Sequence, residues 1–140
     1  MKGVLLQLCY LLVLGSVAHA LPLTPPIRAQ APENTEGGPP PPTSERWYTN
    51  ADRSIWMYGE TDFVAGKPAK VAWFRPAATD LKVSGRRTDG PAPPLHIKIG
   101  TGAQYRHRFT PSLMTFPTPG RWEIRAKTGK SELRLVIRVR

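Results

Sequence analysis

Residues 116–124 read Phe-Pro-Thr-Pro-Gly-Arg-Trp-Glu-Ile, and with the run that follows to Arg140 they are the most strongly specified part of this chain. Pro117 and Pro119 have fixed φ angles and bias the residues before them to extended conformations. Gly120 permits a left-handed conformation directly before the next segment. The chain is therefore expected to turn sharply here and to enter a β-strand at Arg121.

Two runs of alternating apolar residues follow this turn. The apolar positions are Trp122, Ile124 and Ala126 in the first run, and Leu133, Leu135, Ile137 and Val139 in the second. Alternation with a period of two is typical of strands that are buried on one face. The predicted strands are Arg121–Lys127 and Ser131–Arg140, and together they form a β-hairpin.

A loop of two or four residues centred on Thr128-Gly129 sets the expected register of this hairpin. In that register apolar residues face one another on the buried side, and opposite charges meet on the wet side. The expected cross-strand pairs are Trp122–Leu135, Ile124–Leu133, Glu123–Arg134 and Arg125–Glu132.

The same stretch resembles known proteins. Phe116 to Ile124 is similar to the corner that enters the penultimate strand of bacterial immunoglobulin-like domains, where a Pro-Gly-x-aromatic step is common. It more closely resembles a group of small uncharacterised secreted bacterial proteins that carry a Phe-Pro-Thr-x-Gly-x-Trp-Glu run. In that group the residue before Trp is often Cys, whereas here it is Arg121, so no thiol chemistry carries over. The resemblance implies a fold and no particular activity.

The first 20 residues predict a secretory signal peptide. A basic start is followed by an apolar run from Val4 to Leu14 and by Ala18-His19-Ala20, which predicts cleavage after residue 20. The alternative is an uncleaved membrane anchor, but the run is shorter than the ~20 residues that a span needs. Cleavage would remove Cys9, the single cysteine, so the mature protein is expected to be secreted or periplasmic without a disulfide or a transmembrane segment.

Residues 21–45 are predicted to be a disordered, Pro-rich tether. Their clearest feature is the run Gly37-Gly38-Pro39-Pro40-Pro41-Pro42, in a segment with almost no aromatic or β-branched residues. Such a composition buries too little apolar surface to offset the entropy lost on ordering. The alternative is a Pro-rich ligand for a small recognition domain.

Residues 46–140 are predicted to form one immunoglobulin-like antiparallel β-sandwich of about seven strands. No window has apolar residues at helical spacing, and the prolines exclude long helices. Turn signals, among them Ser84-Gly85, separate short strand candidates. Besides the hairpin, these are Ser54–Tyr58, Ala69–Arg75, Leu81–Ser84, Leu95–Ile99 and Ala103–Phe109. A small barrel is the competing architecture, and in either case Trp73 and Trp122 are expected in the core.

No constellation of catalytic or metal-binding residues is visible. Only His96 and His107 remain after export, and a zinc site needs three or four clustered ligands. The serines lack a nucleophile-elbow motif. The acidic pair in Glu60-Thr61-Asp62 is too small for a calcium cage and is interpreted as solvated charge. We therefore expect no catalytic residue, cofactor or metal; hydrolysis that depends on His107 is the alternative.

Positive charge is the most unusual property of the composition of this domain. Residues 46–140 contain 18 Lys and Arg against 7 Asp and Glu, a net charge of +11. Such a charge favours association with anions such as membrane phospholipid or envelope polymers, and nucleic acid is not an expected partner. The alternative is that the charges provide solubility and protect sheet edges. The candidate anion-binding face comprises Arg121, Arg125, Arg134, Arg138 and Arg140.

Three aromatic residues near the start of the domain are candidates for contact with sugar rings or a protein partner: Trp47, Trp56 and Tyr58. The alternative is that they pack the first strand against its sheet. The sequence thus predicts an exported, non-catalytic binding or structural module that contacts an anionic envelope surface. A protein-interaction or assembly subunit of the cell envelope is the alternative.

Overall fold

The computed structural model describes residues 20–29, 44–60, 62–75, 80–100 and 109–140, which contain nine strands and no helix. The all-β prediction is confirmed. No helix that could cross a membrane occurs in these ranges. The strands are β1 (Ile27–Ala29), β2 (Ser44–Thr49), β3 (Trp56–Gly59), β4 (Ala69–Phe74), β5 (Leu81–Arg87), β6 (His96–Ile99), β7 (Phe109–Thr115), β8 (Gly120–Thr128) and β9 (Ser131–Val139).

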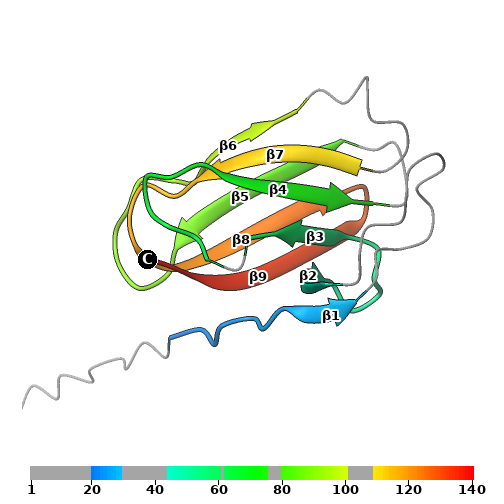
Figure 1. Ribbon diagram of the computed structural model, residues 1–140, viewed down its shortest axis with the longest axis horizontal. Helices are drawn as coiled ribbons and strands as arrows, with labels where there is room; N and C mark the ends of the chain where they lie inside the picture. Colours follow the sequence, from blue (N-terminus) through cyan, green and yellow to red (C-terminus); the bar gives the residue numbers. More distant parts are fainter. Residues whose placement is uncertain (1–19, 30–43, 61, 76–79, 101–108) are drawn as a thin grey trace, which may run out of the picture.

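The strands form two sheets that pack as a β-sandwich. The larger sheet has the order β1-β2-β3-β4-β7-β6, and the smaller one has the order β5-β8-β9. Every ladder within the two sheets is antiparallel. In Figure 1 the strands of the two sheets overlap in projection, with β6 and β1 at opposite margins. The sandwich is therefore the architecture, and the chain does not close into a barrel.

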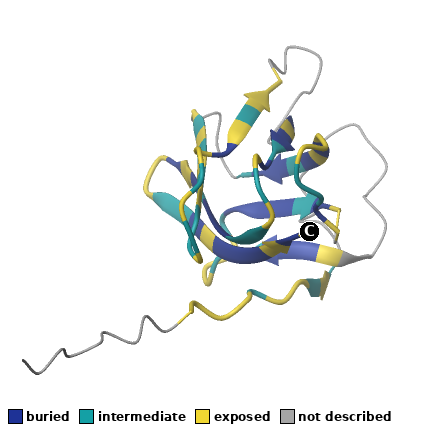
Figure 2. Ribbon diagram, turned by 90° about the vertical axis from the view of Figure 1, so that its left-hand side faces the viewer, coloured by how far each residue is buried: buried dark blue, intermediate teal, exposed yellow. Residues whose placement is uncertain are grey.

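The core lies between the two sheets, where apolar side chains from alternate strand positions meet. Figure 2 marks the buried stretches of the strands in dark blue. Trp73 and Trp122 are fully buried there, as expected. The ring of Phe116 packs edge-on against Trp122 at a centroid distance of 5.4 Å. The indole Nε1 of Trp122 donates a hydrogen bond of 3.0 Å to the carbonyl of Thr118. The corner at residues 116–122 is thus fixed by packing and by a hydrogen bond.

The terminal hairpin has the predicted faces but not the predicted register. Its turn is Gly129-Lys130, because Thr128 pairs with Ser131, so each pair is shifted by two residues along β9. Gly129 has a φ of 56°, and glycine is the residue that suits the first position of a two-residue hairpin turn. A shift of two preserves which side chains point inward. The observed pairs include Trp122–Ile137, Ile124–Leu135, Glu123–Val136 and Arg125–Arg134, so the four predicted pairs are wrong.

Two other strands differ from their predicted bounds. β5 continues through Ser84-Gly85, which was expected to be a turn. A side chain at residue 85 would place its Cβ 2.9 Å from Leu95, so this glycine permits close packing instead of reversing the chain. β7 begins at Phe109, where the predicted strand was expected to end. Residues 103–108 of that prediction, and with them His107, lie outside the described residues.

The prediction of a disordered tether over residues 21–45 does not hold for residues 27–29 and 44–45, which lie in strands. Ile27–Ala29 forms β1 and pairs with β2, which itself begins at Ser44. The backbone N–H of Thr24 donates to the carbonyl of Val136 at 2.8 Å, and the Thr24 hydroxyl accepts from the Val136 N–H at 2.9 Å. This segment covers the outer edge of β9. Residues 30–43 of the predicted tether lie outside the described residues.

Candidate functional site

One face of the smaller sheet is densely basic. Residues 82, 84 and 86 of β5 point away from the core, as do the odd-numbered residues 121–127 of β8 and the even-numbered residues 132–138 of β9. We call this surface the basic face. It carries two acidic side chains, Glu123 and Glu132, and seven basic ones: Lys82, Arg86, Arg121, Arg125, Lys127, Arg134 and Arg138.

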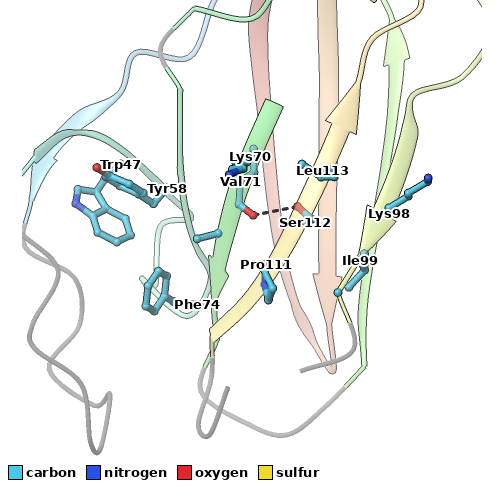
Figure 3. Close-up of a pocket in the computed structure, with 12 residues that line it drawn as sticks. Trp47, Tyr58, Lys70, Val71, Phe74, Lys98, Ile99, Pro111, Ser112 and Leu113 are labelled. Atoms are coloured by element: carbon cyan, nitrogen blue, oxygen red, sulfur yellow. Dashed lines mark hydrogen bonds between the residues drawn. The ribbon is translucent and has the colours of Figure 1, made fainter. Parts of the chain in front are cut away.

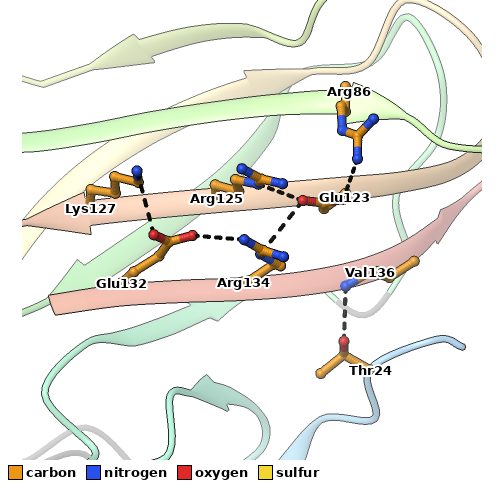
Figure 4. Close-up of polar contacts among 8 residues, drawn as sticks. All are labelled: Thr24, Arg86, Glu123, Arg125, Lys127, Glu132, Arg134 and Val136. Carbon is orange, nitrogen blue, oxygen red and sulfur yellow. Dashed lines mark hydrogen bonds and ion pairs between the residues drawn. The ribbon is translucent and has the colours of Figure 1, made fainter. Parts of the chain in front are cut away.

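Glu123 lies at the centre of the basic face beneath three guanidinium groups (Figure 4). Its side chain is 2 % exposed. It accepts hydrogen bonds from Arg86 Nη2 at 3.0 Å and Arg125 Nε at 2.5 Å, and Arg134 Nε lies 3.7 Å from it. Burial raises the pKa of Glu123, but the hydrogen bonds from the two arginines outweigh burial and hold this pKa below its ordinary value.

Glu132 also forms ion pairs with basic side chains, nearer the hairpin turn. It lies 3.4 Å from Lys127 Nζ and 3.5 Å from Arg134 Nη2. Arg125 and Arg134 are directly opposed across the two strands, and a like-charged pair in that position is destabilising. The two carboxylates therefore neutralise the crowded centre of the basic face.

The other end of the basic face has no acidic side chain of its own, and the nearby carboxylate of Asp89 is paired with Arg87. Arg121 and Arg138 are cross-strand neighbours. Arg121 Nη1 donates to the carbonyl of Leu21 at 2.7 Å, and Arg138 makes no ion pair with an acid in the described part of the chain. Two opposed guanidinium groups that form no ion pair with a described carboxylate are an arrangement that favours binding of an external anion.

The structure groups four of the five predicted arginines and separates the fifth. Arg121, Arg125, Arg134 and Arg138 share the basic face, whereas Arg140 lies at the end of the chain and pairs with Asp62. Sequence reasoning missed three further members of the face: Lys82, Arg86 and Lys127. Arg86 was overlooked because β5 was expected to stop at a turn before it, whereas Lys82 lay within the predicted strand. Their alternation with Leu81 and Val83 was the available signal.

The predicted aromatic contact residues lie on the outer face of the larger sheet. Trp47 is fully buried and Trp56 is 6 % exposed, in a second apolar cluster that also contains Phe74. The ring centroids of Trp47 and Trp56 are 5.8 Å apart, and Tyr58 is half-buried beside them at 4.8 Å from Trp47. Trp47 and Trp56 therefore pack the sheet and present no open ring face, whereas Tyr58 borders the surface.

An apolar groove of about 700 Å³ adjoins this cluster. Figure 3 shows Trp47, Tyr58 and Phe74 on one side of it, and Lys98 and Ile99 on the other. The floor crosses the strands from Ala72 in β4 to Pro111 in β7, which are paired in the sheet. The full lining is Trp47, Tyr58, Lys70, Val71, Ala72, Phe74, Lys98, Ile99, Gly100, Pro111, Ser112 and Leu113.

Groups suited to catalysis or metal binding do not gather in the described ranges. His96 is exposed on β6. Asp62 is engaged by Arg140, and no cluster of three or more metal-ligating side chains occurs among the residues described. Among the described residues, the basic face and the apolar groove are the candidate sites for binding.

Comparison with known proteins adds no family to these observations: no family model matches the chain, and neither a curated protein nor a solved structure is significantly similar to it. Function must therefore be argued from the two surfaces themselves.

Proposed function

We propose that this chain is an exported, non-catalytic binding module whose basic face contacts an anionic surface of the cell envelope. The observation that carries the proposal is the count of seven basic and two acidic side chains on one face of a three-stranded sheet. Neighbouring strands are about 4.8 Å apart, so cations that are cross-strand neighbours, such as Arg121 and Arg138, are anchored closer together than the Debye length of about 8 Å at physiological ionic strength. Their fields add, and the face attracts polyanions or anionic lipid headgroups.

The arrangement of the acids supports binding over mere solubility. Glu123 is covered by arginines, so a ligand approaching the face meets guanidinium groups and not the carboxylate. Arg86, Arg134 and Lys127 keep 67 %, 56 % and 58 % of their side-chain surface exposed. The unneutralised pair Arg121–Arg138 is the part of the face where we expect phosphate or carboxylate groups to bind most tightly.

We also infer an immunoglobulin-like fold for the sandwich. The order β3-β4-β7-β6 opposite β5-β8-β9 corresponds to the ABED and CFG sheets of constant-type immunoglobulin domains when the seven strands are lettered in chain order. β1 and β2 extend the first of these sheets. The Pro-Gly-x-aromatic corner at Phe116–Trp122 supports the same inference. A sandwich of this kind in an exported protein is consistent with a binding role.

Assembly with another protein is the alternative, and less in the structure supports it. Trp56 is buried within its sheet and offers no aromatic surface. The edge of β9 is covered by Thr24 and by the stretch after β3, where Phe63 bridges to Val139. The outermost strands β1, β5 and β6 are the positions left for a protein partner to extend a sheet.

The experiment is co-sedimentation of the mature protein with anionic vesicles, neutral vesicles and cell-wall material at low and high salt. Lys82→Glu/Arg138→Glu reverses two exposed charges of the basic face that take no part in the Glu123 network. Arg46→Glu/Lys67→Glu is the matched control, because both residues are exposed elsewhere. We expect salt-sensitive binding that only the first variant loses. Equal retention at low and high salt would refute the proposal.

A further inference from the structure

We propose that the apolar groove on the larger sheet binds the chain of a single-chain anionic amphiphile, a long-chain fatty carboxylate, with Lys70 and Lys98 receiving the carboxylate. The basic face and this groove belong to different sheets, so the inference does not rest on the function proposed above. Three observations carry it: the shape of the groove, the exposure of its apolar side chains and the placement of its charges.

The groove has the size and lining of a ligand site. Its volume of about 700 Å³ falls within the range of about 300–1,000 Å³ that is typical of small-molecule pockets. The floor of the groove is formed by the small or compact residues Ala72, Pro111 and Gly100. Larger side chains form its two sides (Figure 3). A side chain at residue 100 would place its Cβ 2.9 Å from Pro111 Cγ, so glycine is needed where these segments approach.

Apolar side chains remain open to solvent inside this groove. Leu113 is 39 % exposed and Ile99 is 36 % exposed, and both line it. The half-buried ring of Tyr58 lines the same groove. Scattered exposed apolar residues need no explanation, but apolar residues gathered along one concave surface mark a place where an apolar ligand is shielded from water.

Charge selects the kind of apolar ligand. Lys70 in β4 and Lys98 in β6 are both paired with Leu113 in β7, so their Cα atoms lie about 10 Å apart on either side of it. No acid lines the groove, and neither lysine forms an ion pair with a described acid. Lysine stems extend along apolar surface while their ammonium groups stay at the water boundary. An acyl chain ending in a carboxylate matches this combination.

Other ligands fit the groove less well. A sugar ring stacks on an exposed aromatic face, but Trp47 is fully buried at this site. A neutral hydrocarbon would leave both ammonium groups without a partner. A fatty carboxylate uses the apolar floor and the two cations together.

The test is titration calorimetry of the full mature chain with dodecanoate below its micellar concentration, alongside octanoate, decanoate and neutral dodecanol. Each added methylene is expected to tighten binding about threefold to fourfold until the groove is filled. Lys70→Gln/Lys98→Gln is expected to weaken dodecanoate binding about tenfold while changing dodecanol binding less than about twofold. Lys67→Gln/Lys130→Gln is the matched control, since it removes two exposed lysines that lie outside both the groove and the basic face and should leave dodecanoate affinity unchanged.

Leu113→Asp provides a second variant that keeps the test decisive. The side chain is partly exposed, so the fold should tolerate the change, and the new carboxylate would pair with the two lysines and repel the ligand. Loss of dodecanoate binding in a folded Leu113→Asp protein supports the site. The proposal is overturned if wild-type protein fails to bind dodecanoate, if neither groove variant affects binding, or if Lys82→Glu/Arg138→Glu abolishes it, which would assign the ligand to the basic face.

Discussion

At the scale of single residues, Glu123 determines whether the basic face is compatible with a stable sheet. Its carboxylate is the buried acid among guanidinium groups that would otherwise repel one another across three strands. Replacing it with an amide removes the charge but keeps the shape, so the arginines lose their common partner. We expect Glu123→Gln to lower the free energy of unfolding by about 1–3 kcal/mol, measured by urea denaturation at pH 7. Glu132→Gln is the control and should cost less than about 1 kcal/mol, because that side chain is partly exposed.

The pH dependence of this effect has a definite sign. Because the folded pKa of Glu123 lies below the ordinary value of 4.5, the stabilisation by its ionised form is present above pH 4.5 and is lost as pH falls through the folded pKa. The difference in unfolding free energy between wild type and Glu123→Gln should therefore shrink on acidification to pH 3. A difference that stays constant or grows on acidification would show that the charge of Glu123 is not what stabilises the sheet.

Gly85 shows how one residue can be misinterpreted from sequence. It punctuates the run Leu81–Arg87 and was assigned to a turn, yet it lies within β5 because Leu95 packs against its backbone. Gly85→Ala is expected to destabilise the domain by about 1–3 kcal/mol, since the new methyl group meets both Cβ and Cδ2 of Leu95 and the two segments must move apart. Thermal or urea unfolding measures this cost. Ser84→Ala, on the exposed side of the same strand, should be near neutral, and Gly85→Ala should cost less in a Leu95→Ala background.

At the scale of elements, the segment before β1 serves as a cover for the edge of β9. The Thr24 hydroxyl accepts the N–H of Val136, and without it that amide would be left to water or to another chain. Thr24→Val should cost about 1 kcal/mol and speed hydrogen exchange at the Val136 amide about fivefold. Thr118→Val is the control, because the buried Thr118 hydroxyl has no hydrogen-bond partner and its loss should cost nothing. Unchanged exchange at Val136 would mean that the segment does not protect this edge.

The strands differ in how well the sequence predicts them. β8 and β9 are predicted because nine-residue alternation is unambiguous, and only the register failed, since the position of a two-residue turn depends on one φ angle at Gly129. β7 was predicted to end at Phe109, where it begins, and it contains Pro111, a residue type that is unusual in a central strand. The Pro111 carbonyl accepts a hydrogen bond from the Gly100 N–H, just beyond the end of β6. Proline has no backbone N–H to donate, and Pro111 lies where the ladder between β6 and β7 ends, so no ladder hydrogen bond is lost. β1 pairs with β2, and β2 pairs in turn with β3. Both strands were missed because the composition of this segment suggested disorder.

The candidate sites show the same limit. Four arginines of the basic face were predictable, because alternation along two adjacent strands places them on one side. The groove was not predictable, because Lys70, Leu113 and Lys98 come from three strands whose order in the sheet is a property of the topology. Alternation tells which side of a strand a residue faces. It does not tell which strands are neighbours.

At the scale of the whole molecule, the sandwich separates two kinds of surface. The smaller sheet presents the basic face, and the larger sheet presents the apolar groove, with the core between them. A charge reversal on the basic face should therefore leave dodecanoate binding intact, and the groove variants should leave vesicle binding intact. The basic face concentrates seven basic and two acidic side chains, a net charge of +5 out of the +11 in residues 46–140, and binding to it must weaken with salt.

The most direct measurement is therefore the affinity of the mature protein for anionic vesicles across a range of salt concentrations, with Lys82→Glu/Arg138→Glu measured in parallel. We predict that wild-type binding falls steeply with salt, that neutral vesicles are not bound, and that the variant binds more weakly with a shallower salt dependence. Binding that is absent at low salt, or that is the same for wild type and variant, would contradict the assignment of the basic face as the functional surface.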